Sequence, residues 1–539
     1  MTPMKYYALS RFSVIVVLSV ALVLIIAGCA APPRVEPTLA PTQPETTSPT
    51  TVGPTDTPAL PTPVPTEVGM PTETTSPQDT PVVAPSTTSV TSATVAGRWE
   101  GEIALPGTAL EIVVAFEDQG GQLSGQIRIP AQLAADIPLH DIRIESPKLH
   151  FEMLSGPQLA VFDGELLPDG SLGGGFTQGG YEGEFTLRPA LTTPAEVVPY
   201  REEEMTFENG DITLAGTLTL PEGDGPFPAV LLLTGSGLQN RDEEISLAPG
   251  YKPFRVIADT LTRQGIAVLR YDDRGVGQSG GDPAQATTID FAADAEAAFN
   301  MLLAHPKIDP KRVGLIGHSE GGIIAAMLAA RNSDVAFVIG MAPPAVNGYD
   351  FLVKQVQRMA VASGLSEEEV AQAADQQRQM LDLTVAKDWQ ALEDYLKQLA
   401  SEQIQALSKE QQAALGDPAE VARQQIASLM KLSKSPWYQT FLTYDVGQDW
   451  AKVTVPVLAL FGGLDVQVDA DQNSPALKSA LDKAKNSDVT VKVFPKANHL
   501  FQEAVTGSVE EYATLPTDFV PGFLDTISDW LLERVKTNN

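Results

Sequence analysis

The sequence predicts an α/β fold with a mostly parallel, doubly wound sheet and a helical cap, preceded by a small antiparallel β barrel or sandwich. From about residue 203, apolar runs such as Ala229–Leu233 and Ile266–Tyr271 alternate with helical stretches such as 289–303. That alternation is typical of a parallel sheet covered by helices on both faces. Residues 97–188 differ, because short strand-like runs are separated there by Gly, Pro and Asp turn signals, as in an antiparallel barrel or sandwich.

The N-terminus resembles that of a bacterial lipoprotein. Lys5 and Arg11 precede an apolar run from Val14 to Ala27 that is short for a membrane span, and the run leads into Gly28-Cys29. The resemblance to a lipobox implies cleavage before Cys29 and lipid attachment to it; the alternative is an uncleaved signal anchor. Cys29 is the single cysteine of the 539-residue chain, which excludes disulfides and a thiol nucleophile.

Composition divides the remainder of the chain. From residue 31 to 95 it is mostly Thr, Pro and Ser and cannot bury a core, so we expect an extended tether. The predicted organisation is a signal peptide at 1–28, a tether at 29–95, a β domain at 96–190 and an α/β domain at 200–539, with a helical cap at 346–435. The net charge of −32 disfavours nucleic acid as a partner.

The motif Gly317-His318-Ser319-Glu320-Gly321 lies between an apolar strand and a helix. Strand, sharp turn and helix form the nucleophile elbow that exposes a serine hydroxyl at the top of a sheet. A second match to the same pattern, residues 277–281, follows a polar turn and precedes Asp282-Pro283 rather than a helix. Ser319 is therefore the candidate nucleophile, and Ser279 is interpreted as a loop serine.

A serine nucleophile needs a base, and the chain has five histidines. His140 and His150 belong to the β domain, where we expect ordinary strand residues and no metal site. His318 adjoins the serine, with its side chain expected to point away from the hydroxyl, and His305 precedes a proline before the elbow strand. His499 follows the last predicted strand at the carboxyl edge of the sheet, where open α/β sheets place their sites, so His499 is the predicted base.

A third residue must orient the imidazole. Asp465 directly follows an apolar strand and lies at the same sheet edge, whereas Asp469 and Asp471 are alternatives further into the loop. The order Ser319, Asp465, His499 along the chain is the order that nucleophile-elbow enzymes use. We therefore predict these three as the catalytic residues, with no metal and no cofactor.

The oxyanion of an acyl-transfer reaction needs two backbone N–H donors. One is predicted from Glu320, which follows the nucleophile, and the other from Ser236 in the loop after the first long strand, with Gly237 as the alternative.

Taken together, residues 203–535 resemble the α/β-hydrolases of the serine-esterase and S33-aminopeptidase-like branch, and most of all the EstD-type bacterial esterases. The resemblance rests on the elbow, the two loops that carry Asp465 and His499, and further motifs: Thr234-Gly235-Ser236-Gly237, Gln239-Asn240-Arg241-Asp242-Glu243 and Leu269-Arg270-Tyr271-Asp272-Asp273-Arg274-Gly275-Val276-Gly277. It implies carboxylesterase activity on short- to medium-chain acyl esters. Asp469 stands where a common pattern has proline. Asp242 and Glu243 are interpreted as solvated loop charge, with the alternative that they face the site.

Several alternatives remain open at this point. A peptidase or an acyltransferase would use the same triad, and amine recognition would need acidic residues in the cap, such as Glu367–Glu369. A binding lipoprotein with an inert hydrolase domain is a further alternative. Met359, Trp437 and Phe441 are candidates to line an acyl pocket. The expected partners are a small-molecule ester and, through the lipid, the extracytoplasmic face of a bacterial membrane.

Overall fold

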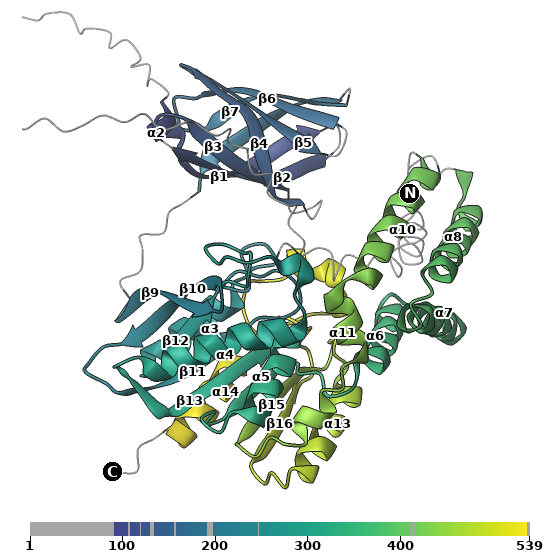
Figure 1. Ribbon diagram of the computed structural model, residues 1–539. Coiled ribbons are helices and arrows are strands. Elements are labelled where there is room, and N and C mark those ends of the chain that lie inside the picture. The colour runs from purple at the N-terminus through teal and green to yellow at the C-terminus, as the bar shows by residue number, and fades with distance from the viewer. Residues whose placement is uncertain are drawn as a thin grey trace, which may run out of the picture.

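A computed structural model describes residues 91–535 except 106–107, 119, 130–133, 156–157, 180, 191–197, 246, 410–411 and 413–416. The predicted signal peptide, Cys29 and nearly all of the predicted tether lie outside the described residues. The described part consists of an antiparallel β barrel followed by an α/β unit with a group of helices at one side (Figure 1). No helix within these described ranges is long and apolar enough to cross a membrane.

The first domain is a closed barrel of eight antiparallel strands, each hydrogen-bonded to the next and the last to the first. After the short helix α2 (Ser92–Val95) come β1 (Gly97–Leu105), β2 (Thr108–Asp118), β3 (Leu123–Ile129), β4 (Ala134–Glu145), β5 (Lys148–Ser155), β6 (Gln158–Leu166), β7 (Leu172–Gln178) and β8 (Tyr181–Pro189). Its interior is filled by aromatic rings, among which Phe151 stacks on Phe162 with centroids 4.6 Å apart. The prediction of a small antiparallel barrel is confirmed.

Sequence reasoning found no possible metal ligands beside His150, but the structure places two carboxylates there. Asp141 and Glu152 bring carboxylate oxygens to the same place as the His150 ring, and one ligand atom from each lies within 4.8 Å of the others. The reason is a bulge in β4, where the register with β5 shifts between His140 and Arg143. A local irregularity of this kind leaves no signature in residue spacing.

The second domain is built on a sheet of eight strands in the order β16-β15-β14-β13-β11-β12-β10-β9. Their bounds are β9 (Tyr200–Asn209), β10 (Ile212–Pro221), β11 (Phe227–Leu233), β12 (Ala267–Tyr271), β13 (Ile308–His318), β14 (Val338–Met341), β15 (Val457–Gly462) and β16 (Val489–Phe494). From β12 to β16 all neighbours are parallel, as predicted. The antiparallel hairpin β9–β10 at one edge was not predicted.

Helices cover the sheet, since β11, β12 and β15 are buried along almost every residue and therefore have both faces packed. One packed pair is α3 (Pro253–Arg263) with α14 (Phe523–Val535), and another is α4 (Thr288–Ala304) with α5 (Glu320–Arg331). The remaining elements are the short helix α12 (Gly447–Trp450), the longer helix α13 (Ala470–Lys483) and the 3-10 turns η2 (Pro283–Gln285) and η3 (Val509–Thr514).

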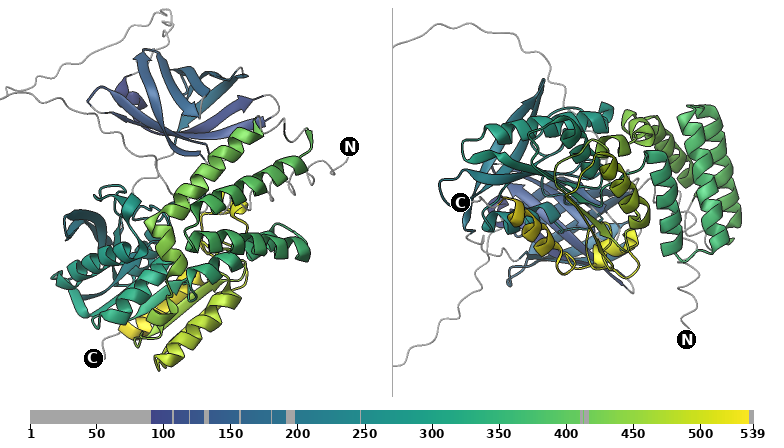
Figure 2. Two further views of the ribbon diagram at one scale, coloured as in Figure 1. Left: turned by 45° about the vertical axis from the view of Figure 1, so that its right-hand side comes forward. Right: turned by 90° about the horizontal axis from the view of Figure 1, so that it is seen from below.

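Between β14 and β15 the chain forms the cap, which stands to one side of the sheet in both further views (Figure 2). Its helices are α6 (Gly348–Ala362), α7 (Glu367–Val385), α8 (Trp389–Ala406), α10 (Pro418–Lys434) and α11 (Pro436–Thr443). Of these, α6 and α11 pack on each other and contribute residues to the pocket above the sheet, whereas α8 and α10 form a small apolar cluster of their own. The prediction of a helical cap on a doubly wound sheet is confirmed.

Candidate active site

The nucleophile elbow is present in its strained form. Ser319 connects β13 to α5 with φ +54° and ψ −117°, a conformation that L residues rarely adopt. A Cβ on Gly317 would lie 2.1 Å from the carbonyl oxygen of Gly321, and a Cβ on Gly321 would lie 2.1 Å from that of Leu233. The turn is therefore possible only with glycine on both sides of the serine, which is the physical reason for the motif.

An imidazole and a carboxylate meet in the pocket that contains Ser319. His499 Nδ1 lies 2.8 Å from Asp465 Oδ2, and both side chains are buried. Asp465 Oδ1 accepts hydrogen bonds from the backbone N–H groups of Gln467 at 2.7 Å and Val468 at 2.8 Å. Because an ionised carboxylate only accepts, Nδ1 carries the proton and the Nε2 lone pair is available to act as a base.

The alternative acids have other partners. Asp469 caps α13 through Gln472 and forms an ion pair with Arg358 of the cap helix α6, with Oδ2 3.0 Å from Nε. Asp471 is exposed on the first turn of α13. Among the predicted acids, Asp465 is thus the one whose carboxylate contacts His499. Its catalytic role stays a prediction.

The loop after β11 approaches the nucleophile closely. A Cβ on Gly235 would lie 3.3 Å from Ser319 Cβ, and Ser236 and Glu320 both line the pocket around Ser319. The Gly235 N–H donates to Glu243 Oε1 at 2.9 Å and is therefore already engaged. The assignment of the N–H groups of Ser236 and Glu320 as oxyanion donors, with Gly237 as the alternative to Ser236, stays a prediction.

The interpretation of Glu243 and Asp242 as solvated charge is wrong. Glu243 is 2% exposed, has φ +56°, and lies 2.9 Å from His318 Nδ1, while Asp242 is largely buried and pairs with Arg270. His318 Nε2 donates to the carbonyl oxygen of His499 at 3.0 Å. Burial disfavours the imidazolium of His318, but the Glu243 carboxylate outweighs burial and raises the pKa. Sequence reasoning missed this Glu243–His318 pair, which supports the backbone of the predicted base.

Glu320 contributes more than its backbone. Its buried carboxylate accepts hydrogen bonds from Thr288 Oγ1 at 2.5 Å and from Trp437 Nε1 of cap helix α11 at 2.8 Å, and a further one from the Ser236 hydroxyl. Burial raises the pKa of this carboxyl group, and the three donors oppose that effect. The Glu320 side chain, next to Ser319, therefore contacts the loop after β11, the helix α4 and the cap.

The pocket above Ser319 is small, with a cavity volume of about 80 Å³, and most of its wall area is apolar. Trp437 and Phe441 stack at 5.3 Å and line it, as predicted for two of the three cap candidates. Met359 was predicted as the third, but it packs against Val466 instead. A wall whose area is mostly apolar suits a small acyl or alcohol group.

Comparison with known proteins supports the fold of the second domain. A family model described as "Serine aminopeptidase, S33" matches residues 251–503. Esterase EstD of Thermotoga maritima is 29% identical over 317 residues, which cover 58% of this chain and 65% of EstD. The second domain has the α/β-hydrolase fold. The matched family and the elbow motif are both typical of serine hydrolases.

Two further similarities are weaker. The polyketide transferase claH of Penicillium crustosum is 28% identical over 151 residues, which cover 26% of this α/β-hydrolase and 44% of claH. The structure of a Pyrococcus furiosus esterase aligns at 16% identity with a TM-score of 0.37, covering 62% of this chain and 91% of that one. The chain spans just under two thirds of EstD and less than half of claH.

Proposed function

We propose that this α/β-hydrolase is a carboxylesterase that hydrolyses short- to medium-chain acyl esters through an acyl-enzyme. The observation that carries the proposal is the buried 2.8 Å contact between His499 Nδ1 and Asp465 Oδ2, in the pocket that also contains the strained Ser319. The esterase relative supports the substrate class.

The proposed reaction uses these groups in turn. His499 Nε2 takes the Ser319 proton as the oxygen attacks the ester carbonyl, and the N–H groups of Ser236 and Glu320 stabilise the oxyanion. His499 then returns the proton to the departing alcohol. Water, activated by the same imidazole, hydrolyses the Ser319 ester and releases the acid. Asp465 stabilises the imidazolium that forms in both steps.

An acyltransferase of the same fold is the second candidate, because a polyketide transferase is among the similar proteins. The apolar pocket wall favours an ester over a peptide, and the three acidic residues suggested for amine recognition, Glu367–Glu369, are exposed at the start of α7. Esterase, peptidase and transferase are separated by the leaving group and the acceptor.

The test has two steps. A fluorophosphonate probe is expected to label the protein, and the label is expected to disappear in Ser319→Ala while Ser279→Ala retains it. Rates on p-nitrophenyl esters, on aminoacyl anilides, and on p-nitrophenyl esters with added alcohol are then compared. Ester hydrolysis at least a hundredfold faster than anilide hydrolysis supports the proposal, whereas well-folded protein without labelling refutes it.

We also propose that Cys29 anchors the enzyme by lipid to the outer face of a bacterial membrane. The support is the lipobox-like Ile26-Ala27-Gly28-Cys29 after a basic and apolar N-terminus. Metabolic labelling with a fatty-acid analogue in a bacterial host is expected to mark the wild-type protein but not Cys29→Ala. Equal labelling of both would refute the anchor and leave the esterase proposal untouched.

A further inference from the structure

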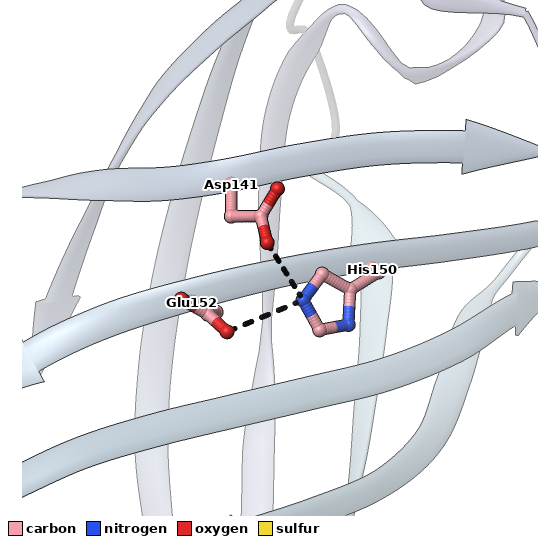
Figure 3. A group of neighbouring side chains, drawn as sticks. All are labelled: Asp141, His150 and Glu152. Atoms are coloured by element: carbon pink, nitrogen blue, oxygen red, sulfur yellow. Dashed lines mark ion pairs between the residues drawn. The ribbon is translucent and has the colours of Figure 1, made fainter.

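Three side chains that could hold a metal ion meet on the outer face of the barrel, on β4 and β5 (Figure 3). His150 and Glu152 alternate along β5 with buried core residues such as Phe151, so their side chains face outward. Asp141 reaches them from β4. His150 Nε2 lies 3.6 Å from Glu152 Oε1 and 3.9 Å from Asp141 Oδ2.

The position of Asp141 depends on the β4 bulge. Asp141 has φ +46°, and the pairing of β4 with β5 is regular again at Arg143 opposite His150. A bulge re-aims one side chain relative to a regular strand. Here it brings the Asp141 carboxylate beside the imidazole of His150.

The His150 ring is held by a second carboxylate. Its Nδ1 lies 2.6 Å from Asp163 Oδ1 on β6. Because that carboxylate accepts, Nδ1 carries the proton and Nε2 presents a lone pair. Nε2 is buried and has no hydrogen-bond partner, since 3.6 and 3.9 Å exceed hydrogen-bond distance. A carboxylate behind a histidine whose other nitrogen faces further ligands is the usual support of a metal-binding imidazole.

We propose that Asp141, His150 and Glu152 bind a divalent transition-metal ion, with Zn²⁺ as the best-fitting ion. Zinc takes one imidazole and two carboxylates readily, and tetrahedral bonds of about 2.1 Å place ligand atoms about 3.4 Å apart. The two Nε2-to-oxygen distances exceed that by a few tenths of an ångström, which the partly exposed carboxylates can close.

Charge supports a dication. The carboxylates of Asp141, Glu152 and Asp163 bring three negative charges, and Arg143, whose Nη2 lies 2.8 Å from Asp141 Oδ2, offsets one. With a neutral His150 two negative charges remain, which a divalent ion neutralises. Water would complete the coordination, because the group lies at the surface.

The experiment is calorimetric titration of the full-length protein with zinc chloride in a non-chelating buffer at pH 7.5. One high-affinity site is expected. His150→Ala is expected to weaken it at least a hundredfold, and Asp163→Asn tenfold to a hundredfold through loss of the support for the ring. His140→Ala, an exposed histidine on the neighbouring strand outside the cluster, is the matched control and is expected to bind as the wild type.

Far-UV circular dichroism and ester hydrolysis are measured on every variant, and both are expected to stay unchanged because none of these residues lies in the active-site pocket. Zinc affinity that is the same in wild type and His150→Ala overturns the proposal. Absence of zinc binding in the wild type also overturns it. If Asp141→Asn and Glu152→Gln then lower the thermal stability, the three side chains form an ion-pair cluster instead.

Discussion

Asp465→Asn is the substitution that tests the triad most directly. Two backbone N–H groups, those of Gln467 and Val468, point at the same carboxylate oxygen, Oδ1. In the variant the amide oxygen must take that place, because the alternative sets the amide N–H₂ against two donors. The amide N–H₂ therefore faces His499 Nδ1, which must become an acceptor. The imidazole proton then moves to Nε2, toward the nucleophile, and the base is lost.

The expected loss is about 10⁴-fold in kcat, the size that a wrong histidine tautomer causes in a serine protease. That factor corresponds to about 5.4 kcal/mol of transition-state stabilisation. The assay is steady-state hydrolysis of p-nitrophenyl acetate, with KM expected to change by less than threefold because Asp465 does not touch the substrate. Folding is retained, since the amide oxygen still satisfies both backbone donors.

Asp469→Asn is the matched control. Asp469 lies four residues further on, is equally buried, and pairs with Arg358 rather than with an imidazole. Its activity is expected within about threefold of wild type. Retention of more than a tenth of kcat by Asp465→Asn, or a larger loss in the Asp469 variant, would refute the assignment of the acid.

Three further outcomes are expected. Glu243→Gln keeps an acceptor for the Gly235 N–H but removes the negative charge that faces His318. We expect kcat/KM to fall about tenfold, which corresponds to the loss of one charge-assisted hydrogen bond. An unchanged kcat/KM would contradict a positioning role for Glu243. Arg128→Ala removes a partly buried ion pair from the barrel to Glu244 beside the active-site loop, and hydrogen exchange over 240–250 is expected to rise. Unchanged exchange would mean that the barrel does not support that loop. Burial, reinforced by the charges of nearby carboxylates, raises the pKa of Asp273 from 3.8 to about 8. Between these two pH values the folded protein keeps a proton on Asp273 that the unfolded chain has released. The free energy of unfolding therefore falls by about 1.4 kcal/mol per pH unit as the pH rises. In urea titrations at pH 5 and 7, Asp273→Asn is expected to lose about 2.7 kcal/mol less than wild type, and equal losses would contradict the raised pKa.

The parts of the fold that the sequence predicted are those with a strong local signal. Buried parallel strands are continuous apolar runs, and the elbow is confined to five residues whose glycines are needed for steric reasons. Asp465 and His499 could be chosen because residues that directly follow parallel strands gather at one edge of the sheet. The β9–β10 hairpin was missed because its strand β9, Tyr200–Asn209, is polar and lies at the edge.

Contacts between distant loops could not be predicted in the same way. Glu243 looks like surface charge in a polar loop, and only the fold brings it to His318, 75 positions away. Asp141 and Asp163 reach His150 through barrel pairing and a bulge, neither of which has a spacing signature. Side-chain charge in a loop is therefore weak evidence of exposure when glycines let that loop approach the sheet closely.

The acidic character of the active site follows from the same geometry. Four acidic residues are buried near Ser319 or its loops: Glu243, Asp273, Glu320 and Asp465. Glu243 contacts His318 and the Gly235 N–H, and Asp273 accepts from Thr234 and Gln239. Glu320 accepts from Trp437 of the cap, and Asp465 from the N–H groups of Gln467 and Val468. Buried carboxylates are tolerated where donors are fixed, and here the donors belong to the oxyanion loop, α4 and the cap. Removing the acceptor oxygens of any one of them would free a segment that holds the predicted oxyanion donors in place. The field of the Glu243 and Asp465 carboxylates also disfavours anionic acyl groups, so an ester with a free carboxylate is expected to be a poorer substrate than its neutral analogue.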